Sequence, residues 1–373
     1  MGTVRKDPRS SGWQARYRDR AGRQRTKTFD SRGDARRYLD TIESDLARGT
    51  YCDPQAGKVR FADFAEEWRK SVVHLRAGTL SNIDTRLAVH ILPEFGKYPL
   101  SAIEPSDVRG WVAALTRKEL APTSVVPIYR LFARIMSVAE SDGKIPRSPC
   151  RGVALPAQVS RTEMRFLTPE QIRDLAERIG PRYRTLIYTA AYTGMRWGEC
   201  GALTVANCKL LHGRIDVVQS LTEVSGYHVI GPTKTGKVRS IAIPRFLVDL
   251  LADHIARFPG EGGIVFTGTE GKPLRRHFLR RRFHPAVKEA GLAPGLRFHD
   301  LRHTCVSLLI AQGAHPKEIS ERLGHSTIRL TFDRYGHLLP SLDDRLRDGL
   351  DRLWNESLAS PDAAVRTVVG LAP

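Results

Sequence analysis

Residues 299–304 read His-Asp-Leu-Arg-His-Thr, the most informative stretch of the sequence. The pattern predicts the start of a helix with His299, Arg302 and His303 on one face. A histidine and an arginine three positions apart near a helix start can both contact one phosphate, helped by the positive end of the helix. An N-terminal cap followed by a core-facing histidine would produce the same six residues. The hexamer by itself therefore leaves both interpretations open.

Four further segments in the C-terminal half carry residue types suited to phosphate chemistry. They are Thr-Gly-Met-Arg-Trp-Gly-Glu at 193–199, Thr-Lys-Thr-Gly at 233–236, Leu-Gly-His at 323–325 and Asp-Arg-Tyr-Gly-His at 333–337. Taken singly, each has an ordinary explanation. An arginine beside a glycine turn is typical of a helix boundary, and a lone tyrosine is usually a core residue. Their meaning therefore depends on their occurring together.

In order, spacing and local context, these segments resemble the catalytic motifs of the tyrosine recombinase (phage integrase) family. The resemblance covers about residues 165–345 and implies six catalytic residues, which are Arg196, Lys234, His299, Arg302, His325 and Tyr335. It implies an enzyme that cleaves and rejoins DNA strands through a 3′-phosphotyrosyl intermediate and a free 5′-hydroxyl. Because this intermediate keeps the bond energy for rejoining, no ATP, metal ion or other cofactor is expected.

Three of these six residues would neutralise the negative charge of the phosphate. Arg196 and Arg302 offer planar guanidinium groups to the non-bridging phosphate oxygens, which become more negative in the transition state. His325 would add a hydrogen bond to the same phosphate. The resemblance also implies that Glu199 supports the site by orienting an arginine or a histidine. An exposed helix acid would explain Glu199 equally well.

The other three catalytic residues would take part in proton transfer. The pKa of a free tyrosine is about 10, so Tyr335 needs a base to act as the nucleophile. His299 is the candidate for that base. Lys234 would donate a proton to the departing 5′ oxygen, and its Thr-Lys-Thr-Gly context favours it over Lys237. His303 is expected to be structural.

A different motif overlaps the Lys234 segment. Residues 231–237 match Gly-x-x-x-x-Gly-Lys, the opening of a phosphate-binding P-loop. The next residue is Val238, where the P-loop needs Ser or Thr to hold magnesium, and the following segment is β-like. We therefore expect a β-turn with a lysine at its tip and no nucleotide site. The five cysteines form no Cys-x-x-Cys pair, so no metal site is expected either.

Charge and composition limit the classes of protein to which the chain can belong. The 373 residues carry a formal net charge of +19, which suits a polyanionic partner such as double-stranded DNA. A hydrophobic content of 41% and a charged content of 27% are typical of a soluble globular protein. No apolar run reaches about 18 residues, and the N-terminus lacks the apolar stretch of a secretory signal. We expect a cytoplasmic, nucleoid-associated protein of a bacterial host, without a membrane partner.

Hydrophobic periodicity predicts a multidomain, mainly α-helical protein with small β-sheets. We expect a small β-sheet plus a helix, then an all-helical bundle, then a mixed α+β catalytic domain. The predicted boundaries are 1–52 for an arm-type DNA-binding domain, 59–143 for a core-site-binding helical domain, 165–355 for the catalytic domain and 356–373 for a C-terminal tail. The roles of the first two domains are implied by their position and pattern in the family.

Several individual elements are predicted as well. Thr168 and Gln171 form a capping box at a helix start, and Pro127 is placed in the first turn of a helix over 124–141. Strands are expected at 13–17, 23–29, 214–218, 227–230 and 238–243. An amphipathic helix over 340–354 resembles the family's C-terminal segment that docks on a neighbouring subunit. It would also fit a helix that packs on its own domain.

Two basic regions are candidates for DNA contact. The N-terminal sheet would carry cations on its outer face, where it can enter a major groove; the candidates are Arg16, Arg18, Arg25 and Lys27. A second basic run contains Arg275, Arg276, Arg280, Arg281 and Arg282. Either region would also fit a solvated basic face.

The resemblance implies a phage or mobile-element integrase that integrates and excises element DNA as a homo-tetramer. Core-type and arm-type DNA sites, a host DNA-bending factor and an excisionase are its expected partners. A chromosome- or plasmid-dimer resolvase of the same family is the alternative, although it would usually lack the N-terminal domain. A non-catalytic DNA-binding regulator and a single-strand-nicking topoisomerase are rivals from other classes.

Overall fold

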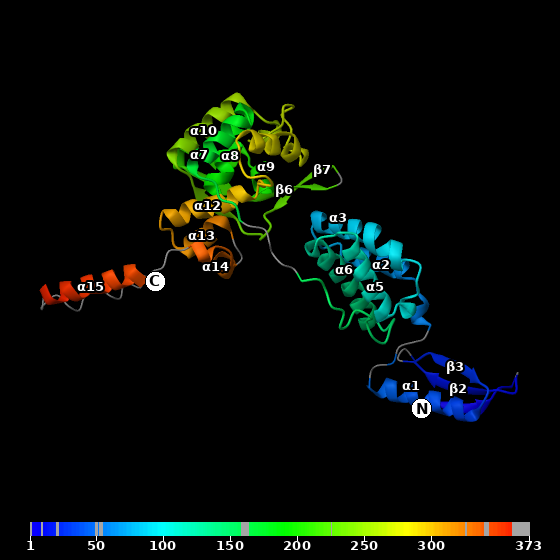
Figure 1. The fold of residues 1–373 in the computed structure, drawn as a ribbon. Coiled ribbons are helices and arrows are strands. Elements are labelled where there is room, and N and C mark those ends of the chain that lie inside the picture. Colours follow the sequence, from blue (N-terminus) through cyan, green and yellow to red (C-terminus); the bar gives the residue numbers. More distant parts are fainter. Residues whose placement is uncertain are drawn as a thin grey trace. The chain divides into compact units, whose positions relative to one another are not determined.

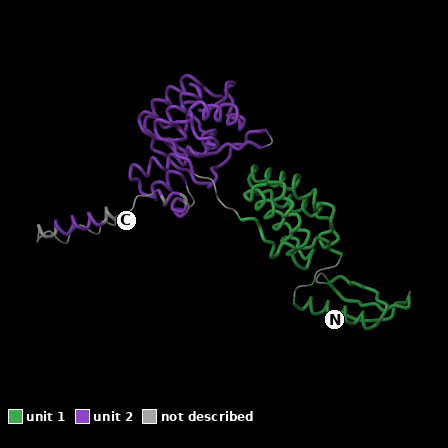
Figure 2. The backbone as a smooth tube through the Cα atoms, in the orientation of Figure 1, with its two compact units in different colours: residues 1–162 green, residues 163–373 purple. Residues whose placement is uncertain are grey.

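The structure is a computed structural model that divides into two compact units, residues 1–162 and residues 163–373 (Figure 2). The described residues are 2–8, 10–19, 22–48, 51, 55–157, 164–224, 226–324, 327–338 and 343–359. Helices predominate, and the strands form small antiparallel sheets. The predicted fold class is therefore confirmed.

The first unit begins with a three-stranded antiparallel sheet and the helix α1 (Figure 1). The elements are β1 (Thr3–Lys6), β2 (Trp13–Arg18), β3 (Gln24–Phe29) and α1 (Arg32–Arg48). Ala15 and Tyr17 alternate with polar residues along β2 and are buried in one cluster with apolar side chains of α1. This alternation is the signal that predicted β2. The prediction missed β1, because Thr-Val-Arg-Lys has no clear hydrophobic period.

The rest of the described first unit is helical. Its elements are η1 (Ala56–Lys58), α2 (Phe61–Ser71), α3 (Ala77–Arg86), η2 (Leu87–Ile91), α4 (Leu92–Phe95), η3 (Leu100–Ala102), α5 (Pro105–Arg117) and α6 (Pro122–Ser141). Phe95 stacks on Phe132 with 4.4 Å between ring centroids, and Trp111 meets Phe95 edge-on, so these aromatics join α4, α5 and α6. The placement of Pro127 in the first turn is wrong. Proline suits the first helical position, and Pro122 starts α6 there, which leaves Pro127 inside the helix.

The second unit combines helices with two small sheets (Figure 1). One sheet has the order β4 (Cys208–Lys209), β5 (Arg214–Val217), β8 (Arg239–Ala242); the other is a hairpin of β6 (Gln219–Val224) and β7 (Tyr227–Pro232). The α-helices are α7 (Pro169–Arg178), α8 (Pro181–Thr193), α9 (Trp197–Gly201), α10 (Arg245–Arg257), α11 (His284–Glu289), α12 (Asp300–Ala311), α13 (Pro316–Leu323), α14 (Arg329–Tyr335) and α15 (Asp343–Ala359). Short helical turns lie at η4 (Val205–Asn207), η5 (Leu210–His212), η6 (Glu261–Gly263), η7 (Leu279–Phe283) and η8 (Gly336–Leu338).

Local sequence signals in this unit correspond to observed hydrogen bonds. The Thr168 hydroxyl accepts from the Gln171 backbone N–H at 3.3 Å, and the Gln171 side chain accepts from the Thr168 N–H at 3.0 Å. The predicted capping box is therefore confirmed. Strands β5, β7 and β8 overlap the three predicted strands. The prediction missed β6, whose residues Gln-Ser-Leu-Thr-Glu-Val are mostly polar.

Helix α12 is the buried element that positions the site. Leu301, Cys305 and Val306 are each at most 1% exposed, and α12 packs along α8. Because the core surrounds α12 on more than one side, polar residues are buried with it, among them Asp300 and Thr304. Arg302 is 3% exposed and His303 is 4% exposed.

Helix α15 presents apolar side chains to solvent. Its residues Leu350, Leu353 and Trp354 are each more than 60% exposed. Residues 340–342 of the predicted C-terminal helix lie outside the described residues. Among the side chains of α15 whose burial is described, these three apolar ones therefore face solvent. No described helix is both long and apolar enough to cross a membrane.

Candidate active site

The turn between α8 and α9 positions Arg196. Gly194 ends α8 in the left-handed conformation, with φ at 68°, and Arg196 caps α9 two residues later. The Arg196 backbone N–H donates to Glu199 Oε2, and its Nη1 donates to Glu199 Oε1, each at 2.9 Å. Glu199 is 1% exposed, so it is not an exposed helix acid. The predicted pairing of this glutamate with an active-site arginine is present.

Arg239 on β8 holds the same carboxylate from the other side. Its Nη2 donates to Glu199 Oε2 at 2.6 Å and its Nη1 to Oε1 at 3.2 Å. Its Nε donates to the carbonyl of Arg322, at the end of α13. Burial alone would raise the pKa of Glu199, but the hydrogen bonds and charges of Arg239 and Arg196 outweigh it and hold that pKa below its usual value.

Arg302 lies on α12 with its guanidinium buried. Nη1 donates to the Gly194 carbonyl at 2.6 Å, and Nη2 donates to the Leu323 carbonyl at 2.7 Å. Burial, followed by repulsion from Arg196, lowers the pKa of Arg302 to about 9. Two guanidinium groups close enough to repel one another form a site that an anion would stabilise. That Arg196 and Arg302 bind one phosphate stays a prediction.

Two histidine rings lie next to each other at the start of α12. The rings of His299 and His303 meet edge-to-face, with centroids 5.1 Å apart and planes at 89°. His299 is at the surface, whereas His303 is buried. Partial burial of its ring, followed by the charges of His303, Arg302 and Arg297, lowers the pKa of His299 to about 4. His299 is therefore neutral at pH 7, the form in which it can accept a proton.

Tyr335, at the end of α14, is buried and contacts His303. Its side chain is 1% exposed and belongs to a cluster with Val306, Ile310, Ile319 and Leu323. His303 Nδ1 lies 2.6 Å from the Tyr335 hydroxyl. His303, which the sequence predicts to be structural, therefore contacts the proposed nucleophile directly. Its place on the face shared by His299 and Arg302 was the signal in the sequence.

Lys234 lies at the surface in a turn. The Gly236 N–H donates to the Thr233 carbonyl at 2.9 Å, and the Thr233 hydroxyl donates to the Lys237 carbonyl at 2.8 Å. Both lysines of the turn are exposed, and strand β8 follows, not the helix that a P-loop requires. The predicted β-turn is therefore present. His325 lies outside the described residues, so the structure describes five of the six predicted catalytic residues.

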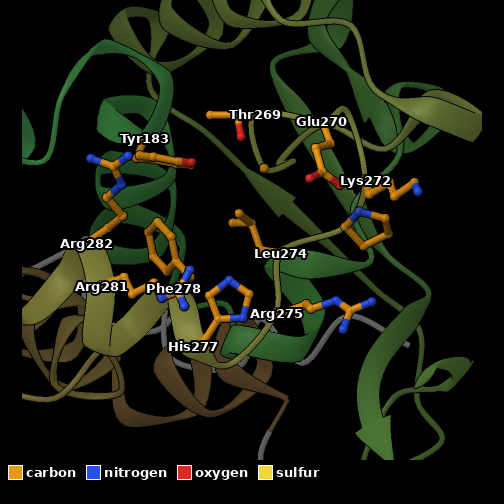
Figure 3. Close-up of a pocket in the computed structure, with 12 residues that line it drawn as sticks. Tyr183, Thr269, Glu270, Lys272, Leu274, Arg275, His277, Phe278, Arg281 and Arg282 are labelled. Carbon is orange, nitrogen blue, oxygen red and sulfur yellow. The ribbon is translucent and has the colours of Figure 1, made fainter. Parts of the chain in front are cut away.

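The second basic run lines a cavity of about 430 Å³ (Figure 3). Arg275, Arg281 and Arg282 surround it together with Lys272 and His277. The remaining predicted cations of the run, Arg276 and Arg280, are also exposed. The Arg276 backbone N–H donates to Glu223 on β6 at 2.8 Å, which attaches this segment to the hairpin. Phe278 joins the run to the active-site turn, because its ring stacks on Trp197 at 5.5 Å.

The N-terminal cations do not all lie on the outer face of their sheet. Residues paired across an antiparallel ladder point to the same side. Lys27 pairs with the buried Ala15 and Arg25 pairs with the buried Tyr17, so both lie on the face that α1 covers. Lys27 lies over the ring of Tyr38 in α1 at 4.6 Å, and Arg25 bonds Asp19 at 3.0 Å. The prediction of an outer-face position for these two is wrong.

The pairing register of the strands places other cations on the face of the sheet that α1 does not cover. Arg16 and Arg18 alternate with the buried residues of β2, as predicted. Arg5 on β1 pairs with Gln14 and therefore shares their side of the sheet, which the sequence prediction missed because it missed β1.

Comparison with known proteins places these residues in a family. Residues 165–341 match the phage integrase family, and residues 60–116 match the N-terminal SAM-like domain of phage integrases. A putative prophage phiRv2 integrase of Mycobacterium tuberculosis is 31% identical over 359 residues, covering 92% of this chain and 93% of that relative.

Two solved structures share the fold. A Tn1549 transposon integrase in complex with a circular intermediate DNA has a TM-score of 0.67 at 19% identity, covering 79% of this chain and 99% of that one. A lambda integrase tetramer bound to a Holliday junction has a TM-score of 0.55 at 19% identity, covering 87% and 95%. The sequence similarity extends over nearly the whole chain, and the fold is shared with solved integrases. The chain belongs to the phage integrase family of tyrosine site-specific recombinases.

Proposed function

We propose that this recombinase is an integrase of a phage or other mobile element, with Tyr335 as its nucleophile. One observation carries the assignment of the residues. The Arg302 guanidinium donates to the carbonyl of Gly194, two residues before Arg196, and the helix that carries Arg302 also contacts Tyr335 through His303. Two cations for a phosphate and a tyrosine hydroxyl are thereby gathered in one domain.

The proposed reaction is a transesterification at phosphorus. The Tyr335 oxygen attacks the scissile phosphate, the bond to the 5′ oxygen breaks, and a 3′-phosphotyrosyl bond forms. His299 accepts the phenolic proton, and Lys234 donates a proton to the departing 5′ oxygen. Arg196, Arg302 and His325 neutralise the phosphate in the transition state. The attack of a 5′-hydroxyl from the partner strand reverses these steps and releases Tyr335.

Glu199 and Arg239 support this chemistry without touching DNA. Glu199 fixes Arg196, and Arg239 connects Glu199 to the end of α13. Residue 325 comes shortly after that end. The network thus fixes the position of Arg196 relative to the end of α13, the segment that leads to His325.

The DNA contacts are assigned to the three predicted domains. The domain over 1–52 would bind arm-type sites, the helices over 59–143 would bind core-type sites, and the domain over 165–355 would perform catalysis. In the first domain, Arg5, Arg16 and Arg18 are the cations on the uncovered face of the sheet. In the catalytic domain, the cations around the cavity of Figure 3 would contact DNA phosphates.

The assembly is proposed to be a homo-tetramer across two duplexes at the nucleoid of a bacterial host. The exposed apolar side of α15 is suited to docking on a neighbouring subunit. A host DNA-bending factor and an excisionase would set the direction of the reaction. A dimer resolvase is the alternative within the family.

A recombination assay tests this function. Purified protein is incubated with two labelled fragments, one carrying the candidate element site from beside its gene and one carrying the chromosomal junction. Joint molecules that form without ATP or added metal are expected from the wild-type chain and not from Tyr335→Phe. Relaxation of supercoiled DNA without joint molecules would indicate a topoisomerase. Recombination only between two copies of one site would indicate a resolvase.

A further inference from the structure

Arg322, in the last turn of α13, reaches the end of another helix. Its Nη2 donates to the Tyr192 carbonyl at 2.8 Å, although the two residues are 130 positions apart in the chain. Carbonyls in the last turn of a helix have no partner within that helix, and they form the negative end of its dipole. The half-buried, positively charged Arg322 therefore stabilises the end of α8.

Arg302 joins the same two helix ends from α12. Its Nη1 donates to the carbonyl of Gly194, which directly follows α8, and its Nη2 donates to the carbonyl of Leu323, the last residue of α13. Both hydrogen bonds can form only while these two carbonyls keep their spacing. A shift of one helix end against the other would turn or release a guanidinium that is 3% exposed. The orientation of Arg302 thus depends on how α8 and α13 meet.

The ends of α8 and α13 are also packed closely together. A Cβ on Gly194 would lie 2.5 Å from Leu323 Cδ2, so the turn after α8 touches the last residue of α13. Arg239, on β8, donates from Nε to the backbone carbonyl of Arg322 at 2.9 Å. The backbone of Arg322 is therefore held from β8, while its side chain crosses to α8.

We propose that Arg322 is a positioning residue for DNA cleavage. By fixing the end of α8 against the end of α13, it sets the spacing of the two carbonyls that orient Arg302. It also fixes Tyr192, four residues before Arg196, and with it the turn that presents this arginine. The inference rests on the proposed function, in which Arg196 and Arg302 bind the scissile phosphate.

Hydrogen exchange in the DNA-free, full-length chain tests this role independently of catalysis. The backbone amides of residues 194–196 are all hydrogen-bonded within the protein. Arg322→Met removes the donor to Tyr192, and exchange of these amides should rise about 10-fold, the factor that corresponds to one hydrogen bond from a charged group. Arg322→Lys, whose ammonium can donate to the same carbonyl, should exchange more slowly than Arg322→Met. Unchanged exchange in Arg322→Met would overturn the proposal.

Single-turnover cleavage of a nicked site tests the consequence for the reaction. At saturating DNA, Arg322→Met should cleave about 10- to 100-fold more slowly than the wild type, because the phosphate-binding arginines are misplaced. Its affinity for DNA should be unchanged, and Arg322→Lys should recover most of the rate. A normal rate in Arg322→Met would overturn the proposal. Reduced affinity with a normal rate at saturation would overturn it too, since Arg322 would then be a DNA contact.

Controls separate these results from a loss of folding and from a failure of the proposed function. Urea denaturation verifies folding, and Arg257→Met, which removes one cation that pairs with Asp253 on α10, should cleave like the wild type. If Arg322→Met does not fold, Arg322→Gln replaces it, because a shorter, neutral side chain also removes the charged donor. Exchange in Arg322→Gln equal to that of Arg322→Lys would then overturn the proposal. Absence of cleavage by the wild type would contradict the proposed function, whereas hydrogen exchange would still show whether Arg322 fixes the turn.

Discussion

At the scale of single residues, the site depends on one buried carboxylate. The Glu199 side chain has no exposed area and is held by Arg196 and Arg239, whose side chains are 22% and 9% exposed. Removing one partner from a buried ion pair leaves a charge that neither water nor protein compensates. Arg239 therefore affects the folding free energy and, through Glu199, the orientation of Arg196.

Arg239→Met tests this network. We expect the free energy of unfolding to fall by about 3 kcal/mol, because Glu199 loses its bidentate partner while remaining buried. DNA cleavage should fall as well, since Arg196 is oriented through the same carboxylate. Urea denaturation and single-turnover cleavage measure the two effects. Arg36→Met is the matched control, because Arg36 pairs with Asp40 on the surface, and it should leave stability unchanged. Equal stability of the two variants would contradict the account.

Glu199→Gln tests the pH dependence of stability. The pKa of Glu199 in the folded chain lies below its ordinary value of 4.5, so its carboxylate contributes stability above that pH. This contribution is lost as the pH falls from about 4.5 through the folded-state pKa. We expect Glu199→Gln to be less stable than the wild type at pH 7 and to lose less stability on acidification. Urea denaturation at several pH values measures this difference, and parallel pH profiles would contradict it.

At the scale of elements, the sequence predicted those strands, helix starts and turns that local hydrophobic periodicity and capping residues determine. Alternation along β2, the capping box at Thr168 and the turn at Lys234 all involve residues close in sequence, so their signals are visible without the fold. The strands β1 and β6 were missed because they are mostly polar, and only pairing with a neighbour makes them strands.

The turn after α8 provides a prediction at this scale. Gly194 and Gly143 both have positive φ, at 68° and 66°. A Cβ on Gly194 would lie 2.5 Å from Leu323 Cδ2, whereas a Cβ on Gly143 would meet nothing within 4 Å. Both alanine variants place a side chain at a positive φ and are destabilised for that reason. The free energy of unfolding of Gly194→Ala should fall by about 1–3 kcal/mol more, because its Cβ overpacks the core. It should also cleave more slowly, because the Gly194 carbonyl accepts from Arg302. Equal losses in thermal or urea unfolding would contradict this account.

At the scale of the whole molecule, the motifs identified residues that the fold brings together from distant parts of the chain. Arg196 and Arg302 were predicted from their motifs, and the Arg302 guanidinium donates to the carbonyl of Gly194, two residues before Arg196. Arg239 was not predicted, because an arginine in a strand carries no signal until its contact with Glu199, 40 residues away, is known. The faces of the N-terminal cations likewise depended on strand register, which a sequence pattern leaves open.

The net charge of +19 leads to a prediction about DNA binding. Each phosphate contact contributes about 0.9 to the slope of log affinity against log salt concentration. Replacing both Arg275 and Arg281 by alanine should therefore reduce that slope by about 1.8. Arg257→Ala is the control, because Arg257 lies on α10, pairs with Asp253 and does not line the cavity. Fluorescence anisotropy between low and moderate salt measures the slopes. An unchanged slope in the double variant would remove this segment from the DNA interface.

Covalent trapping tests the central claim that Tyr335 forms a bond to DNA. The full-length chain is mixed with nicked fragments that carry its site, denatured, and separated on a gel beside Tyr335→Phe. We expect a protein–DNA band that survives denaturation, is absent in the variant, and yields a phosphotyrosyl peptide containing residue 335. A band of equal strength in Tyr335→Phe would place the nucleophile elsewhere and contradict the account.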